Sequence, residues 1–221
     1  MYPRRIVERA RQEGLDMIAV TDHNAADNAG AVIRAAAGTG LTVFPGMEIS
    51  SEEDVHILGI FETMEAIDPV LKVVARNLAG AGAKTNFIRD QVLVDEQDEV
   101  TGFHSQFLAG SVLMSVFEIV ELIRDRGGLA IASHVDRESF SLISQLGFVP
   151  PDLRLDALEA SVRTLPASTG PASALPLVAF SDAHCAGEIG RRSTVFLLAE
   201  PQLSEIRLAL AGAEGRRILD A

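Results

Sequence analysis

The chain is short of cysteine: its single one, Cys185, cannot form a disulfide within the chain and gives no indication of redox chemistry. Long apolar runs are also missing, since stretches such as 177–180 and 195–199 fall far short of the ~20 residues that a membrane-spanning helix needs. Nothing after Met1 resembles the apolar core and small-residue cleavage site of a secretory signal. These absences predict a cytoplasmic protein without a membrane partner.

Positive charge is scarce as well. The 19 Lys and Arg residues face 31 Asp and Glu residues, which leaves a net charge of −12. Such a charge repels long polyanions, so long nucleic acids are not expected as partners. Because salt screens this field beyond about 8 Å, a small anionic substrate held by metal cations remains compatible with it.

Length and patterning predict one α/β domain over residues 1–221. Strand-length apolar runs alternate with helical patterns, which indicates a parallel sheet covered on both faces or closed into a barrel. Residues 81–112 break the alternation and are a predicted insertion, in which 87–94 is compatible with a helix and 95–99 is an acidic run typical of a solvated face. Helices are predicted over 3–14, 25–37, 67–78, 116–126, 137–146 and 202–213, and strands over 16–21, 41–44, 55–61, 129–133, 155–160, 177–181 and 194–198.

The chain places histidines and carboxylates at the carboxyl ends of its predicted strands. The residues that follow such a strand are His23, Glu48, His134, Asp182 and His184. In an α/β barrel these strand ends form one rim, and active sites lie there. His56 lies near the start of its strand, so it joins the rim only if that strand begins later or runs in the opposite direction.

Histidines and carboxylates without cysteine form a nitrogen and oxygen ligand set, which suits Zn, Mn or Fe. Glu48 can bridge two ions with its two oxygens, and an extended segment points Asp182 and His184 the same way. Two cations about 3.5 to 4 Å apart can hold a phosphoryl group and lower the pKa of a bound water. The set therefore predicts hydrolysis of a phosphoester by a metal-activated hydroxide.

Other interpretations of these residues stay open. A single histidine is more often a hydrogen-bonded structural residue than a ligand, and His104, in the predicted insertion, is not placed in the metal set. Asp22 is the candidate catalytic residue, but it can also bind a metal, orient His23 or cap a helix. Arg137 and Arg192 are candidates for binding the substrate phosphate, with surface salt bridges as the alternative.

With these residues identified, the chain resembles the PHP family, the polymerase and histidinol phosphatase superfamily of metal-dependent phosphoesterases. The matching segments are Thr21-Asp22-His23-Asn24, Pro45-Gly46-Met47-Glu48-Ile49-Ser50, Val55-His56-Ile57-Leu58-Gly59, Ser133-His134 and Ser181-Asp182-Ala183-His184. The resemblance implies a distorted (β/α)7 TIM-like barrel, two or three divalent metal ions, and hydrolysis of phosphoesters.

The resemblance also implies a role for each ligand. The implied metal ligands are His23, Glu48, His56, His134, Asp182 and His184. Glu48 would bridge the ions, His56 and His134 would complete one site with it, and Asp182 would belong to a second. The remaining two histidines would belong to a third site.

The sequence departs from the family at its start. Family members open with a strand that ends in His-x-His, and this chain contains no His-x-His. The helix predicted at 3–14 matches the one that follows that strand, so we expect a barrel without its first strand and with unpaired edges beside the gap. A shortened start explains this better than a genuine loss. The site of Glu48, His56 and His134 keeps all of its ligands.

Three functions compete at this point. The first is a metal-dependent phosphoesterase that acts on a small phosphorylated metabolite or a nucleotide. The second is a catalytically silent domain that binds a metal or a partner, as the absent ligands would allow. The third, an amidohydrolase, is disfavoured because the only lysines, Lys72 and Lys84, lie in helical or irregular stretches rather than at a strand end.

Overall fold

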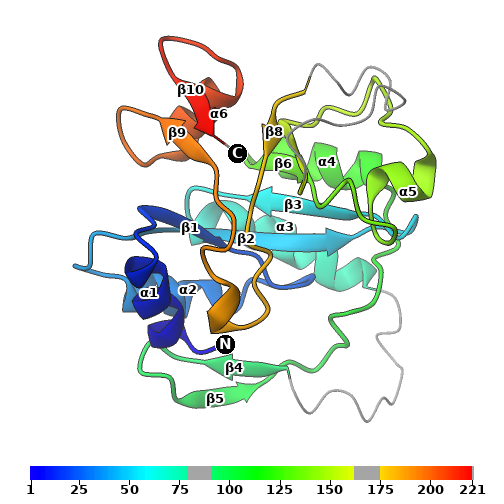
Figure 1. Ribbon diagram of the computed structural model, residues 1–221. Helices are drawn as coiled ribbons and strands as arrows, with labels where there is room; N and C mark the ends of the chain where they lie inside the picture. Colours follow the sequence, from blue (N-terminus) through cyan, green and yellow to red (C-terminus); the bar gives the residue numbers. More distant parts are fainter. Residues whose placement is uncertain (79–90, 162–174, 221) are drawn as a thin grey trace.

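A six-stranded sheet forms the centre of the computed structural model, which describes residues 1–78, 91–161 and 175–220. The sheet curls into a half-barrel in the order β1-β2-β3-β6-β7-β8 (Figure 1). Its strands are β1 (Met17–Val20), β2 (Thr42–Ser50), β3 (His56–Ile60), β6 (Leu129–Ala132), β7 (Ala157–Glu159) and β8 (Leu177–Val178). In the described ranges β1 and β8 are the edges of this sheet. The α/β class is confirmed, but the predicted count of seven strands is not.

The remaining elements are helices and two small two-stranded sheets. The helices are α1 (Pro3–Gln12), α2 (Ala29–Ala35), α3 (Met64–Asn77), α4 (Val116–Asp125), α5 (Leu142–Leu146) and α6 (Leu203–Leu210), with the 3-10 turn η3 (Ala186–Glu188). The small sheets pair β4 (Val92–Val94) with β5 (Val100–Phe103), and β9 (Val195–Leu197) with β10 (Arg217–Asp220). None of the helices in the described ranges is both long and apolar enough to cross a bilayer.

One strand of the main sheet runs against its neighbours. β1 and β2 are parallel, as are β6, β7 and β8, but β3 is antiparallel to both β2 and β6. The expectation of an all-parallel sheet is therefore wrong at β3. Because of this reversal the amino end of β3 lies at the rim, and His56 is the partner of Ser50 at the carboxyl end of β2. His56 thus lies at the rim because its strand runs in the opposite direction, which is the second of the two possibilities that the sequence left open.

Side chains alternate between two packed faces of the sheet. Ile57 and Phe61 pack in the cluster that includes α3 and α4, whereas Leu58 and Ile60 pack in the cluster that includes α6. The apolar part of this second face also holds Leu129. At the rim the same face carries polar side chains instead. A continuous apolar core therefore ends at a polar layer.

Helix ends follow their sequence signals, with one correction. In α4 the Ser115 side chain accepts from Glu118 N–H while the Glu118 carboxylate accepts from Ser115 N–H, a reciprocal cap. The helix predicted over 137–146 is only α5, Leu142–Leu146. Residues 137–140 form bends instead, and the left-handed φ of 56° at Phe140 interrupts the predicted helix.

The described part of the predicted insertion contains a β-hairpin, formed by β4 and β5. Residues 92–94 form a strand, so the helix considered over 87–94 is wrong for this part, and 79–90 lie outside the described residues. The acidic run at 95–99 is the hairpin turn: the Asp95 carboxylate accepts from Gln97 N–H and Glu99 N–H, both at 2.9 Å. The Asn28 side chain donates to the Val92 carbonyl oxygen and accepts from Val94 N–H, both at 3.0 Å. These bonds fix the hairpin against the start of α2.

Candidate metal centre

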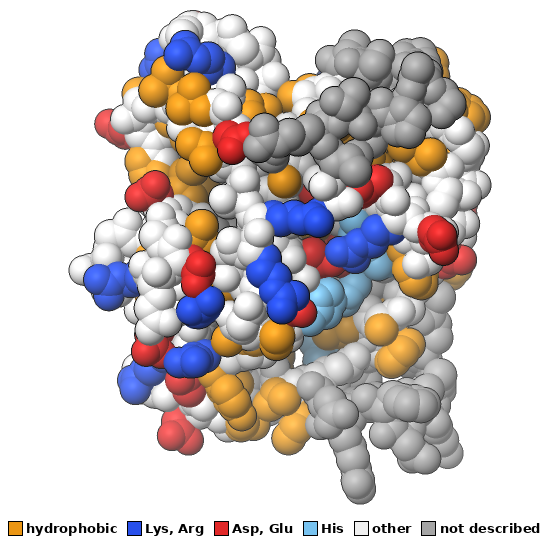
Figure 2. All heavy atoms as spheres, viewed as in Figure 1, with side chains coloured by type: hydrophobic (Ala, Val, Ile, Leu, Met, Phe, Trp, Pro, Cys, Tyr) orange, Lys and Arg blue, Asp and Glu red, His pale blue; other side chains and the backbone are white. Residues whose placement is uncertain are grey.

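Four of the predicted ligands meet at the rim of the half-barrel. Glu48 lies in β2 and His56 opens β3, while His23 and His134 follow β1 and β6. Glu48, His56 and His134 are buried, with 5%, 8% and 5% of their surfaces exposed. We call these four residues the Glu48 cluster. Figure 2 shows histidine side chains together in a hollow of the surface, with basic and acidic side chains beside them.

The carboxylate of Glu48 is the centre of the cluster. Its Oε2 lies 3.3 Å from His23 Nδ1, and its Oε1 lies 3.5 Å from both His56 Nδ1 and His134 Nε2. One ligand atom from each of His23, Glu48 and His56 lies within 4.8 Å of the other two, close enough for the three to bind one ion together. His134 Nε2 adjoins the same point, since it is 3.3 Å from His56 Nδ1.

The electrostatics of the cluster fit a divalent cation. Burial would raise the pKa of Glu48, but hydrogen bonds from His134 and His56 outweigh it and hold the pKa of this carboxyl well below its usual range. Burial lowers the pKa of His23, and its Nδ1 is buried without a hydrogen-bond partner. An ionised carboxylate and a neutral imidazole with an unused nitrogen are the states in which these side chains bind metals.

The Pro-Gly-x-Glu segment positions Glu48 because it lets β2 pass very close to the end of β1. A Cβ atom at Gly46 would lie 2.6 Å from Thr21 Cγ2, closer than carbon atoms approach without a clash. The backbone of Glu48 is tied on both sides: its N–H donates to the Asp22 carbonyl oxygen at 3.1 Å, and its own carbonyl oxygen accepts from Asn24 N–H at 2.9 Å. The loop after β1 is therefore bonded directly to the central ligand.

Asn24 connects this rim to the end of the predicted insertion. It is buried, with a left-handed φ of 48°, a conformation in which Asn is enriched among non-glycine residues. Its Nδ2 donates to the carbonyl oxygens of Leu108 at 2.8 Å and Gly110 at 2.7 Å, and its Oδ1 accepts from Ser50 N–H at 3.1 Å. The segment around 108–110 is thereby fixed against the site.

The other two predicted ligands lie beside the cluster, on the loop after β8. Asp182 has a left-handed φ of 43°, and its Oδ2 lies 2.6 Å from Arg137 Nη2. The side chain of His184 is 68% exposed, and its Nδ1 lies 3.0 Å from the Asp182 carbonyl oxygen. The ring centres of His184 and His23 are 6.3 Å apart. The structure thus brings this pair to the margin of the cluster without direct contact to Glu48 among the described residues.

The remaining predicted site residues also lie at this margin. Arg137, with 52% of its side chain exposed, is bound to Asp182. Arg192 is exposed, and its carbonyl oxygen accepts from Ser181 Oγ at 3.0 Å, so residue 192 lies next to the loop of Asp182. Asp22 is exposed and contacts the cluster through its carbonyl oxygen. It does not cap α2, which begins only at Ala29.

A buried carboxylate beside the cluster was missed by the sequence analysis. Glu159 ends β7 with 5% of its surface exposed, and its Oε2 accepts hydrogen bonds from Ser133 Oγ at 3.0 Å and His134 N–H at 2.9 Å. Burial raises the pKa of Glu159 against the opposing effect of these two bonds. A signal was present, because Glu159 lies near the carboxyl end of a predicted strand, as Glu48 does.

The contacts of His56 and His104 show that only the first of these histidines belongs to the cluster. Phe140 stacks on His56, with ring centres 4.8 Å apart and an angle of 16° between the planes. His104 lies apart from the cluster: its Nε2 is 3.8 Å from Asp27 Oδ2, and its Nδ1 accepts from Gln106 N–H at 3.2 Å. These contacts give His104 a structural role in the insertion.

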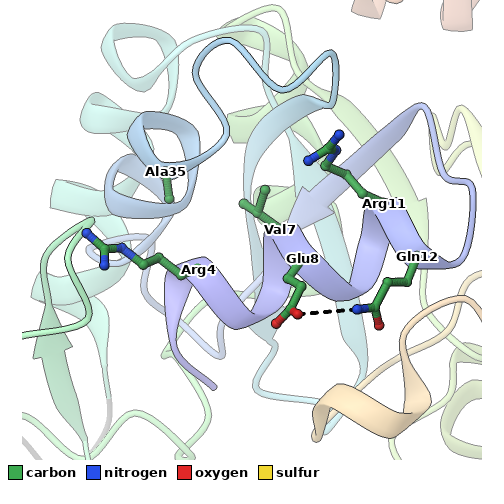
Figure 3. Close-up of a pocket in the computed structure, with 6 residues that line it drawn as sticks. All are labelled: Arg4, Val7, Glu8, Arg11, Gln12 and Ala35. Atoms are coloured by element: carbon green, nitrogen blue, oxygen red, sulfur yellow. Dashed lines mark hydrogen bonds between the residues drawn. The ribbon is translucent and has the colours of Figure 1, made fainter.

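An open groove of about 460 Å³ lies on the helical layer, away from the cluster. Figure 3 shows its lining, which comes from α1 and from Ala35 of α2, with a hydrogen bond from Gln12 to Glu8. No residue of the Glu48 cluster lines it. The groove therefore adds nothing to the metal centre.

Comparison with known proteins agrees with this geometry. The model of the PHP domain matches residues 1–140, which is more than half of the 221-residue chain. No curated protein matches the sequence.

Solved structures share the fold. The lesion-specific endonuclease Q of Pyrococcus furiosus superposes with a TM-score of 0.68 at 20% identity, covering 98% of this chain and 52% of the endonuclease. The chain therefore spans about half the length of that protein. A protein of Bifidobacterium adolescentis assigned as a metal-dependent phosphoesterase superposes with a TM-score of 0.57 at 18% identity, covering 96% of this chain and 91% of the other.

Proposed function

The chain belongs to the PHP family, and on that premise we propose that it is a metal-dependent phosphoesterase that hydrolyses a small phosphorylated metabolite or a nucleotide. The observation that carries the proposal is the Glu48 cluster, in which an ionised carboxylate and three imidazoles converge at the rim of the half-barrel. Such a set of nitrogen and oxygen donors favours Zn, Mn or Fe.

The cluster residues hold the cation, and the margin residues handle the substrate. A divalent ion bound there supplies a Lewis acid and lowers the pKa of a water molecule. With two or three ions, Asp182 and His184 would add ligands at the margin. Arg137 and Arg192 bind the phosphate through charged hydrogen bonds, for which guanidinium groups are well suited. Asp22, next to His23, would accept the proton that the attacking water releases, and burial raises the pKa of its carboxyl.

A second candidate, nuclease activity on DNA, is favoured by one observation: 98% of this chain superposes on about half of endonuclease Q. The net charge of −12 opposes it, because a long polyanion is repelled by such a surface. A short phosphorylated molecule meets less of that field. We therefore place the small substrate first and the nucleic acid second.

Of the two remaining alternatives, the position of the lysines counts against the amidohydrolase only. An amidohydrolase of the carbamylated-lysine type needs a lysine at the metals, yet Lys72 lies in α3 and bonds Asp68. Lys84 lies outside the described residues. A catalytically silent domain that binds a metal would need Glu48 and His23 in the same protonation states, so only turnover separates it from an enzyme.

The test is metal-dependent turnover by the full chain. Aryl phosphate, nucleoside monophosphates and lesion-containing duplex DNA are each incubated with Mn²⁺, Zn²⁺ or Fe²⁺, and released product is measured. We expect turnover of a small ester that Glu48→Gln abolishes. Glu205→Gln, which changes a partly buried carboxylate bound to Arg216 on α6, should leave turnover unchanged. Turnover of DNA alone would reverse the substrate order. Bound metal without any turnover would establish the silent domain.

A further inference from the structure

Glu159 is a buried carboxylate that the proposed chemistry does not use. Only 5% of its surface is exposed, and it lies at the rim end of β7, next to the strand that leads to His134. A buried carboxylate is costly unless it accepts hydrogen bonds. Its Oε2 accepts two, and both donors belong to the segment that carries a metal ligand. The contacts of Glu159 therefore point toward the cluster.

The first donor, Ser133, links Glu159 to the central ligand. Its hydroxyl lies 2.8 Å from Glu48 Oε1 and 3.0 Å from Glu159 Oε2, and the residue is only 2% exposed. Because a hydroxyl has one proton, Ser133 donates to only one of these two carboxylates at a time, and the two oxygens share it. The position of Glu48 Oε1, the oxygen that faces His56 and His134, is coupled through Ser133 to Glu159.

The second donor is the backbone of His134. This residue has a φ of 31°, in a region that residues other than glycine rarely adopt. Such a conformation persists only where neighbouring groups enforce it. The bond from His134 N–H to Glu159 at 2.9 Å is such a constraint, and it determines the direction in which the imidazole leaves the backbone.

We propose that Glu159 is a positioning residue of the metal centre: through Ser133 and the His134 backbone it holds Glu48 and His134 in the geometry that binds the cation, without being a ligand itself. The inference rests on the proposed function in one respect, that the Glu48 cluster binds a divalent ion. Both hydrogen bonds use Glu159 Oε2, and Glu159 is not among the three residues His23, Glu48 and His56 whose ligand atoms lie within 4.8 Å of one another.

The experiment measures Co²⁺ binding to the full chain by calorimetry and by the visible absorption of the bound ion. Glu159→Met removes the acceptor and keeps the volume, so we expect Co²⁺ affinity to fall about 10–100-fold, with an altered absorption band. Glu159→Gln retains an oxygen that can accept both bonds, so we expect it to restore affinity to within about fivefold of the wild type. Ser133→Ala, which removes the link to Glu48, should weaken binding about tenfold and serves if Glu159→Met does not fold.

A matched control lies at the other end of the same strand. Asp156, just before β7, is a largely buried carboxylate with 9% of its side chain exposed. It bonds Arg124 at 2.8 Å, Arg207 at 2.7 Å and Ala130 N–H at 2.9 Å. Asp156→Asn should lower the melting temperature while Co²⁺ affinity and the absorption band stay as in the wild type. This separates loss of stability from loss of ligand geometry.

The outcomes distinguish this inference from the proposed function. If the wild type binds Co²⁺ and Glu159→Met binds it equally well, Glu159 is only a structural residue and the inference is wrong while the metal centre stands. If Glu159→Gln is as impaired as Glu159→Met, the shared hydrogen bonds are not the cause, and the inference is also wrong. If the wild type binds no Co²⁺, the proposed function fails first.

Discussion

The two halves of the candidate site are built in different ways. In the inner half, Glu48, His56 and His134 are buried and bonded to one another. In the outer half, His184 is 68% exposed, and Asp182 is held by a half-exposed arginine. The inner residues come from paired strands or directly follow them, whereas the outer ones follow β8, an edge strand of two residues. Burial and strand pairing on both sides give the inner half one fixed geometry, whereas the outer half is more exposed and follows a strand that, among the described residues, is paired only with β7.

The largest difference is expected when a histidine is removed from each half. His134→Ala deletes a ligand and leaves the buried Glu48 with fewer partners, so Mn²⁺ affinity should fall at least about 100-fold, beyond the 10–100-fold typical of outer partners of a metal site. His184→Ala should cost less than about tenfold. Calorimetric titration of both variants measures this, and equal losses would show that the halves do not differ.

Metal binding should stabilise the protein through the inner half. Mn²⁺ at about 100 times its dissociation constant adds about 2.7 kcal/mol to the free energy of unfolding. We expect Asp182→Asn to keep most of this gain and Glu48→Gln to lose it, as measured by urea unfolding with Mn²⁺ and with chelator. A gain that disappears in Asp182→Asn would assign the tightest ion to the outer half.

The pH dependence of the metal-free protein should report the buried carboxylate. The pKa of Glu48 is lowered on folding, so its ionised form stabilises the folded state at a pH above its ordinary value of 4.5. This contribution decreases as the pH falls below about 4.5, because the unfolded chain then takes up the proton first. The stability gap between wild type and Glu48→Gln, measured in chelator from about pH 7 to pH 3, should therefore narrow. A constant gap would contradict it.

The smallest effect is expected at the outer ion pair. Arg137→Gln should change the free energy of unfolding by less than about 1 kcal/mol, since half-exposed ion pairs contribute little. Arg191→Gln, which removes a similarly exposed pair with Glu188, is the matched control. A loss for Arg137→Gln well above that of the control would mean that the outer half is more rigid than its exposure indicates.

Sequence patterns predicted the Glu48 cluster because each of its candidate ligands adjoins a strand end. His23, Glu48 and His134 follow from that rule alone, whereas His56 needed the direction of β3, which depends on pairing with β2 and β6. Strand direction is a property of distant segments, so local periodicity leaves it open. Glu159 satisfied the same rule but carried no motif to single it out.

The length of α5 and the existence of β10 could not be predicted from the local sequence, for similar reasons. The helix predicted from 137 shortens to α5 because Phe140 has a left-handed φ and Ser141 then caps a helix that begins at Leu142. The strand β10 was not predicted, because it exists only through its antiparallel pairing with β9. In each case a contact between distant residues overrides the propensity of the segment.

The reversal of β3 also affects the order in which the site can assemble. Glu48 and His56 belong to one hairpin, so the short connection at 51–55 brings them together with little loss of chain entropy, on the microsecond scale of hairpin formation. His134 joins them only after β6 has docked on β3. During refolding, binding of a metal ion by all three residues would therefore be a late event. Its rate would report when β6 pairs with β3.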